Sequence, residues 1–208
     1  MAEVPVKRVI VYVDGFNLYF GLRDSNLKRL YWLNIKLLAQ NLLRENQKLI
    51  VTKYFTARIS SPPDKRKRQS TFLEALETLS EFEIFYGHYL SKNITCRNCG
   101  QCWQSFEEKM TDVNIATQML IDSFEDRFDT ALLISADSDL HMPIDRIKKM
   151  FPAKRIIVFF PPNRFSANLK RAADVQLSLG HGLLSKSQFP DKVAKANGYV
   201  LQRPSQWR

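Results

Sequence analysis

The chain has 208 residues, of which 45% are hydrophobic, and this is typical of one folded domain rather than a disordered segment. Its apolar runs are far shorter than a membrane span needs, and its first residues lack the features of a signal peptide. We therefore expect a cytoplasmic protein with no membrane partner. A formal charge of +10 favours an anionic partner such as nucleic acid, with simple solubility as the alternative explanation.

Apolar runs and helical periodicity alternate along the chain. The order begins with a strand over 9–13, a helix over 34–43, a strand over 49–55, a loop over 60–70, a helix with apolar positions 72, 73, 76 and 79, and a strand over 83–90. A helix from 111 to about 122, a strand over 130–135, a helix over 142–150 and a strand over 155–160 follow. Strands separated by helices predict an α/β fold class, a three-layer α/β/α domain around a mainly parallel, Rossmann-like sheet. We assign residues 1–184 to this domain, and 185–208 to a C-terminal tail that either covers the domain or extends from it.

Acidic residues follow two of the apolar runs that we predict to be strands. One run ends at Asp14, and the other leads to Asp137 and Asp139. Asp112 follows Thr111 at a predicted helix start. Because open α/β sheets bind ligands beyond the carboxyl ends of their strands, the four aspartates are predicted to form one acidic site. Helix capping explains Asp112 or Asp139 equally well when each is taken singly.

Clustered carboxylates raise one another's pKa unless a cation offsets their repulsion. All-oxygen ligands fit Mg²⁺ or Mn²⁺ better than Zn²⁺, and such an ion activates water for attack on phosphate. Two further side chains are candidates for the same chemistry. Asn17 would orient a water or a phosphate oxygen, or simply cap the next helix. Lys109 would neutralise charge in the transition state, or be an ordinary surface lysine.

Five segments, taken together and in order, carry a family resemblance. They are VDGFNLY, YFTAR, EKMTDVNIATQML, ISADSDLHMPI and RAAD, and they resemble the NYN domain of the LabA-like group in the PIN-like nuclease superfamily. The resemblance runs from about residue 9 to 175 and implies a Mg²⁺- or Mn²⁺-dependent ribonuclease on a Rossmann-like sheet. Asn17 matches the asparagine after the first aspartate, and Asp174 in RAAD matches with a weaker implication. The acidic cluster implied by the family is Asp14, Asp112, Asp137 and Asp139.

Three cysteines lie close together in the segment CRNCGQC, inside an insert over about 91–108. An odd number argues against a disulfide framework. The spacing of Cys96, Cys99 and Cys102 is that of a zinc knuckle, and His88 is near enough in sequence to be a fourth ligand. A structural Zn²⁺ is therefore one prediction, and reduced free thiols are the other.

Basic residues form two clusters that we predict to hold a nucleic-acid backbone. Each cluster has an aromatic residue near it, Phe72 or Phe165, which would stack on bases of a single strand or belong to the core. Charge runs are also commonly no more than solvated faces. The basic residues are Lys65, Arg66, Lys67 and Arg68 in the first cluster, and Arg164, Lys170 and Arg171 in the second.

Together these features predict a metal-dependent nuclease, an endoribonuclease acting on RNA rather than DNA, with an RNA-binding module of the same fold as the alternative. A phosphatase of the haloacid dehalogenase type is excluded, because it needs a second aspartate where this chain has Phe16. The common dinucleotide and P-loop motifs do not occur. The sequence is compatible with a homo-oligomer.

Overall fold

A computed structural model describes residues 5–96 and 98–208 of the chain. At its centre is a six-stranded sheet in the order β3-β2-β1-β6-β7-β8, in which every neighbouring pair is parallel. The strands are β1 (Lys7–Asp14), β2 (Gln47–Thr56), β3 (Phe82–Tyr86), β6 (Thr130–Ile134), β7 (Arg155–Phe160) and β8 (Val175–Ser178). The predicted three-layer α/β/α architecture is confirmed.

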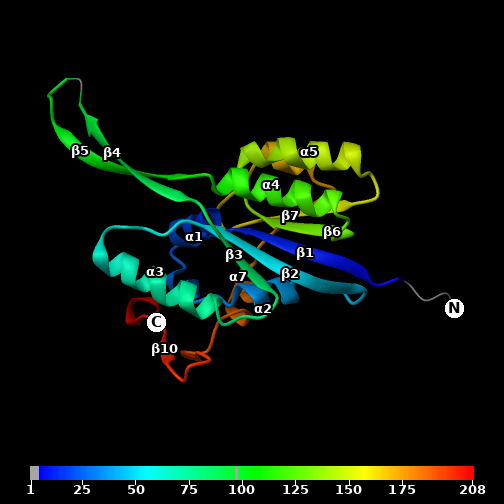
Figure 1. Ribbon diagram of the computed structural model, residues 1–208, viewed down its shortest axis with the longest axis horizontal. Helices are drawn as coiled ribbons and strands as arrows, with labels where there is room; N and C mark the ends of the chain where they lie inside the picture. Colours follow the sequence, from blue (N-terminus) through cyan, green and yellow to red (C-terminus); the bar gives the residue numbers. More distant parts are fainter. Residues whose placement is uncertain (1–4, 97) are drawn as a thin grey trace.

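Helices cover both faces of the sheet (Figure 1). The first face carries α1 (Gly15–Asp24), α2 (Ile35–Asn41), α3 (Pro63–Leu76) and α7 (His181–Lys186), which share one hydrophobic core. The second face carries α4 (Thr111–Phe124), α5 (His141–Met150) and α6 (Ala167–Ala172), which share another. Single 3₁₀ turns complete the helical segments: η1 (Lys28–Leu30), η2 (Ser138–Leu140) and η3 (Ser205–Trp207).

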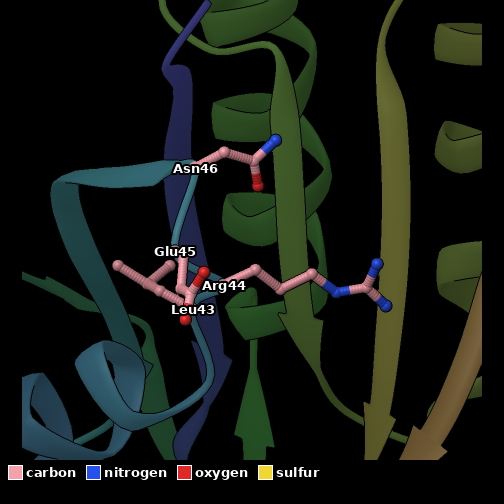
Figure 2. A pocket seen from close by; sticks show the side chains of 4 residues that line it. All are labelled: Leu43, Arg44, Glu45 and Asn46. Carbon is pink, nitrogen blue, oxygen red and sulfur yellow. The ribbon is translucent and has the colours of Figure 1, made fainter. Parts of the chain in front are cut away.

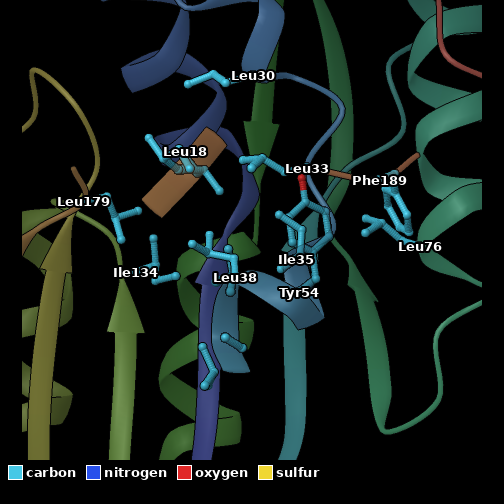
Figure 3. Packing of buried hydrophobic residues seen from close by; sticks show 14 of the residues in the cluster. Leu18, Leu30, Leu33, Ile35, Leu38, Tyr54, Leu76, Ile134, Leu179 and Phe189 are labelled. Carbon is cyan, nitrogen blue, oxygen red and sulfur yellow. The ribbon is translucent and has the colours of Figure 1, made fainter. Parts of the chain in front are cut away.

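The central strand β1 contributes to both cores. Val9, Val11 and Val13 pack in the first, while Ile10 and Tyr12 pack in the second. Successive side chains of a strand point to opposite faces, and both faces of this strand are covered, so it reads as a continuous apolar run. Figure 3 shows part of the first core, where side chains of α1 and α2 meet those of the sheet.

The strand order reverses at β1. The chain first adds β2 and β3 on one side, and then returns to place β6, β7 and β8 on the other. Ligands bind open α/β sheets in the crevice at the carboxyl ends of the strands on either side of such a reversal. Val13 lies opposite Ile134 in the register, so the next residues, Asp14 and Ser135, are neighbours. We call this end of the sheet the carboxyl edge and the opposite end the amino edge.

Two segments lie outside the central sheet. β4 (His88–Thr95) and β5 (Cys102–Lys109) form an antiparallel hairpin that projects from the body and contains the predicted insert (Figure 1). The C-terminal segment forms a small hairpin of β9 (Lys192–Ala194) and β10 (Val200–Gln202). Phe189 and Trp207 from this segment are buried in the first core, so the tail covers the domain.

Three local predictions were wrong. The segment 60–70 is helical from Pro63, because proline suits the first position of a helix, where its φ is favourable and its missing N–H costs nothing. The strand predicted over 83–90 divides at Gly87 between β3 and β4. Thr111 is the first residue of α4 rather than its cap, which is Met110 with a φ of 76°.

No helix within 5–96 and 98–208 is both long and apolar enough to cross a membrane.

Candidate active site

Asp14 lies at the end of β1 and is 3% exposed. Its Oδ1 accepts a hydrogen bond of 2.9 Å from the backbone N–H of Asn17 and so caps α1. The next residue is Gly15, where a Cβ would lie 2.5 Å from the Tyr54 hydroxyl and 2.7 Å from the carbonyl oxygen of Phe55. Glycine therefore lets α1 begin this close to β2 and keeps Asp14 at the carboxyl edge.

Ser135 joins the ends of β1 and β6 through its side chain. Its fully buried hydroxyl donates to Asp14 Oδ2 at 2.9 Å and accepts from the backbone N–H of Asp137 at 3.0 Å. The prediction from sequence did not include Ser135, although a polar residue directly after the apolar run ALLI is a signal for it. This serine holds two of the predicted site aspartates in a fixed relation.

Two further hydrogen bonds hold the turn after β6. Asn17 Oδ1 accepts from the backbone N–H of Ala136 at 3.1 Å. Asp137 Oδ1 accepts from the backbone N–H of Asp139 at 2.9 Å, which starts η2. Asp137 is half-buried, whereas Asp139 is exposed. The side-chain amide oxygen of Asn17 thus fixes α1 against the turn. Asp139 lies at the rim of the site.

Asp112 approaches the same place from α4. It lies in the first turn of that helix, which starts where the projecting hairpin returns to the carboxyl edge at Lys109, an exposed residue. Burial raises the pKa of Asp14 to about 7. The two hydrogen bonds that Asp14 accepts lower this pKa, whereas the charges of Asp112 and Asp137 raise it further. Asp112 and Asp137 are therefore each within electrostatic reach of Asp14.

These carboxylates fit a hard divalent cation. Each Asp14 oxygen accepts one hydrogen bond and has a further lone pair, and a cation would offset the repulsion from Asp112 and Asp137. Within 5–96 and 98–208, no three His, Cys, Asp or Glu side chains are grouped closely enough to ligate one ion together. Mg²⁺ keeps several waters and is commonly bound through only one or two carboxylates, so Asp14 with one neighbouring aspartate would be enough to hold Mg²⁺ or Mn²⁺.

The predicted zinc ligands are not all brought together. His88 starts β4 at the base of the hairpin, whereas Cys102 starts β5 at the far end, opposite Thr95. The seven residue-to-residue steps from His88 to Thr95 span about 24 Å. Cys96 and Cys99 lie in the turn at the far end, so His88 does not join the cysteines.

The first basic cluster, residues 65–68, lies in the first turns of α3. This helix follows β2 after a short connection, so its start lies near the carboxyl edge. The basic side chains are exposed or half-exposed. Phe72, further along the helix, contacts Trp32 and Tyr54 and packs against the first core. Of the two alternatives for Phe72, the structure selects the core.

The fold divides the second basic cluster. Arg164 follows β7 at the carboxyl edge, where its Nη2 lies 2.5 Å from a carboxylate oxygen of Asp24 in α1. Phe165 beside it is 63% exposed. Lys170 and Arg171 lie in the last turn of α6, the end of the helix that leads away from the carboxyl edge. Arg164 and Phe165 are therefore the members of this cluster nearest to the candidate site.

Asp174 lies at the amino edge and outside the acidic site. Its Oδ2 accepts from the backbone N–H of Ile156 at 2.8 Å, and its Oδ1 lies 2.7 Å from the Lys148 ammonium. An open hollow lined by residues 43–46 lies at the same edge (Figure 2), where β1 begins. The eight residues of β1 separate this edge from Asp14 by about 23 Å. Neither feature belongs to the candidate active site.

The comparison with known families identifies the family of this chain. The family model for the NYN domain matches residues 8–180, which is most of the chain. The chain belongs to the NYN domain family. That family is part of the PIN-like nuclease superfamily, so this NYN domain has a nuclease-like fold, and the predicted family is confirmed.

Two known proteins are similar to this NYN domain. One is 6-hydroxy-3-succinoylpyridine 3-monooxygenase HspA from Pseudomonas putida (strain DSM 28022 / S16), 28% identical over 178 aligned residues, with 68% of this chain and 55% of that protein covered. The chain thus spans about half the length of this curated relative. The other is the crystal structure of a protein of unknown function, VPA0982, from Vibrio parahaemolyticus RIMD 2210633. Its TM-score is 0.57 at 19% identity, with 87% of this chain and 98% of that chain covered, which shows the fold alone.

Proposed function

We propose that the chain is a metal-dependent endoribonuclease that hydrolyses phosphodiester bonds of RNA. The observation that supports this most is the approach of Asp112 and Asp137 to the buried Asp14 at the carboxyl edge, where the pKa of Asp14 is raised to about 7. Such a group of carboxylates costs stability unless a positive charge binds among them. A divalent cation that also contacts an RNA phosphate satisfies that requirement.

Each acidic side chain has a part in this proposal. Asp14, Asp112 and Asp137 would hold the ion, and Ser135 keeps Asp14 and Asp137 in position. A bound Mg²⁺ or Mn²⁺ would supply positive charge to the phosphate and increase the acidity of the attacking water. Asp139, exposed at the rim on the same turn, would accept the proton of the water that attacks phosphorus, while the P–O bond to one sugar oxygen breaks and that oxygen takes a proton from solvent.

Basic and aromatic side chains around the carboxyl edge bind the RNA in this proposal. Lys109 lies at the base of the hairpin, three residues before Asp112, and residues 65–68 lie at the start of α3. The exposed ring of Phe165 offers a surface for stacking an unpaired base. The formal charge of +10 adds long-range attraction for the backbone. This combination favours a single-stranded substrate.

Cleavage of a labelled single-stranded RNA, beside a DNA of the same sequence, tests the proposal. Each reaction contains Mg²⁺, Mn²⁺ or EDTA and compares the wild type with Asp137→Asn, which keeps the acceptor oxygen for the backbone N–H of Asp139. Glu45→Gln removes a carboxylate at the amino edge and is the matched control. We expect metal-dependent RNA cleavage that falls by about 100-fold or more in Asp137→Asn and is unchanged in Glu45→Gln. Cleavage that persists in EDTA or in Asp137→Asn contradicts the proposal.

An RNA-binding module that leaves RNA intact is the second candidate. The formal charge of +10 and the basic residues 65–68 at the start of α3 favour it, because they serve RNA binding whether or not the acidic site cleaves. RNA binding that persists in EDTA, without cleavage in any metal, would establish this candidate. The activity in the name of the Pseudomonas putida relative is not proposed, because this chain spans about half of that protein.

A further inference from the structure

The helix α1 crosses the carboxyl edge of the sheet. It begins at Gly15, directly after β1. Further along, Gly21 meets the loop that follows β7, where a Cβ would lie 2.7 Å from the carbonyl oxygen of Pro162 and 2.8 Å from the Cβ of Pro161. Because β6 lies between β1 and β7 in the sheet, α1 passes the end of β6. The helix therefore runs alongside the acidic site.

The sides of α1 differ in what they contact. Asn17 faces the turn after β6 through its hydrogen bond to the backbone N–H of Ala136. Leu18 and Leu22 are buried in the first core. A third side carries residues at the i, i+3, i+4 and i+7 spacing of one helix face. We call these residues the aromatic stripe of α1: Phe16, Tyr19, Phe20 and Arg23.

The aromatic stripe is open to solvent and its members contact one another. Tyr19 is 37% exposed, and Phe16 and Phe20 are half-exposed. The Phe20 ring lies 6.1 Å from that of Phe16 and 5.4 Å from that of Tyr19, measured between centroids. The Arg23 guanidinium lies 4.5 Å from the centroid of the Phe20 ring. Single apolar side chains at a surface are ordinary, whereas a contiguous group marks a binding surface.

Basic residues gather around the later part of the stripe. Lys28 and Arg29 are exposed in η1, which follows α1. Arg23 and Arg164 both pair with Asp24, at 2.9 and 2.5 Å. The four cations outnumber this carboxylate, so this part of the surface keeps a positive charge. Flat rings beside positive charge suit the bases and the phosphates of a nucleic acid.

We propose that the aromatic stripe of α1 binds unpaired bases of the RNA strand that leads away from the acidic site. Phe16 and Phe20 stack on bases, and the Arg23 guanidinium contributes a further flat, charged surface. From Gly15 to Arg23 the helix rises about 12 Å, which matches about three stacked nucleotides at about 3.4 Å each. The inference rests on the proposed RNA substrate, although it does not require that the RNA is cleaved.

A second copy of the chain fits this surface less well than RNA does. Each chain has a formal charge of +10, and a two-fold contact would place the basic residues of one copy against the same residues of the other. An RNA strand brings the opposite charge. The stripe also begins two residues after Asp14, so a strand bound at the acidic site continues onto it.

Binding of single-stranded RNA in EDTA tests the inference separately from cleavage. A fluorescent oligouridine is titrated with the full chain, and binding is measured by fluorescence anisotropy. A second strand of equal length consists of ribose phosphate without bases, so it keeps the charge but has nothing to stack. Phe20→Leu keeps apolar volume beside Phe16 and Tyr19 but removes the flat ring, and Phe20→Ala removes both. Arg23→Lys keeps the charge but removes the planar guanidinium.

Two residues far from the carboxyl edge provide matched controls. Phe124, the last residue of α4, is 75% exposed, so Phe124→Leu removes an exposed ring elsewhere on the surface. Arg155 is exposed at the start of β7, so Arg155→Lys makes the same change of cation as Arg23→Lys. Thermal melts establish that each variant is folded.

We expect both Phe20 variants to bind oligouridine about 10-fold more weakly than the wild type, and Arg23→Lys to bind about 3-fold more weakly. The base-free strand should bind the wild type and these variants equally. Phe124→Leu and Arg155→Lys should match the wild type on both strands. Unchanged binding of oligouridine by the Phe20 variants would overturn the inference, as would an equal loss on the base-free strand or an equal loss in Phe124→Leu.

The remaining outcomes separate this inference from the proposed nuclease activity. Weaker oligouridine binding in the Phe20 variants, with no cleavage by the wild type in any metal, would support the stripe and reject the nuclease. Metal-dependent cleavage with unchanged binding in the Phe20 variants would do the reverse. A doubled molar mass in light scattering that Phe20→Ala abolishes would assign the surface to a second copy and overturn the inference.

Discussion

Asp14→Asn should stabilise the protein at pH 8 in EDTA while it removes the proposed activity. Burial, together with the neighbouring aspartates, raises the pKa of Asp14 from 3.8 to about 7, so the folded state holds this proton more tightly than the unfolded chain does. The resulting stability is fully present below pH 4 and is lost as the pH rises through about 7. At 1.36 kcal/mol per unit, this shift corresponds to about 4 kcal/mol lost by the wild type at pH 8.

Asparagine at this position reproduces the hydrogen-bonding pattern of the neutral carboxyl group. Its oxygen accepts from the N–H of Asn17, and its NH₂ group donates to the Ser135 hydroxyl, so the variant avoids the cost of a buried charge. Urea denaturation in EDTA should give a difference of about 4 kcal/mol in favour of Asp14→Asn at pH 8 and a difference near zero at pH 4.

The same comparison with Mg²⁺ separates a metal site from a merely strained carboxyl group. Mg²⁺ should bind the ionised wild type in preference to Asp14→Asn. It should therefore stabilise the wild type and reduce the difference in free energy of unfolding between the two proteins at pH 8. Glu45→Gln, an exposed charge at the amino edge, should differ little from the wild type at either pH. A variant no more stable than the wild type at pH 8 in EDTA would refute the raised pKa of Asp14.

Other positions give further predictions. Lys53→Met leaves the fully buried Asp122 without an ammonium 2.7 Å away and should cost about 3 kcal/mol in urea denaturation, whereas a loss below about 1 kcal/mol would show that the pair is dispensable. Gly15→Ala forces a methyl group against β2 and should cost about 1–3 kcal/mol, with a weaker stabilisation by Mg²⁺ in thermal melts. Lys65→Gln combined with Lys67→Gln should lower the salt slope of single-stranded RNA affinity by about 1.4, measured by fluorescence anisotropy. An unchanged slope would exclude contact between α3 and the RNA.

The main strands could be predicted because the physics that forms them is local and strong. A parallel strand buried on both faces must be apolar throughout, so the runs that became β1, β6 and β7 stand out in the sequence. The approach of Asp14 and Asp137 followed from one rule, that the carboxyl ends of parallel strands meet at the same edge. Asp112, at the start of α4, was included because of the family resemblance. The roles of Ser135 and of the Asn17 carbonyl depend on the register between β1 and β6, which pairs residues 121 positions apart.

Nearness in sequence was misleading where the chain is extended. His88 lies eight residues before Cys96, a separation that one helix would turn into about 12 Å. The intervening residues form a strand instead, and the same separation becomes about 26 Å. The place of Asp174 could not be predicted from its motif either. The motif RAAD is intact, but the short helix α6 returns the chain to the amino edge before Asp174. A motif specifies which residues occur, but the helix or strand before it determines where those residues lie in the fold.

The position of Asp112 depends on α4, and this helix follows directly on a hairpin that projects from the domain. A helix attached to such a segment needs an anchor of its own. Near the other end of α4, Asp122 accepts hydrogen bonds from the Lys53 ammonium of β2 and the Tyr12 hydroxyl of β1, at 2.7 and 2.6 Å. Buried ion pairs contribute little net stability, but they fix geometry when every partner is satisfied. This network therefore holds α4 against the sheet, so the first turn of the helix keeps Asp112 at the acidic site even though the preceding hairpin projects from the domain.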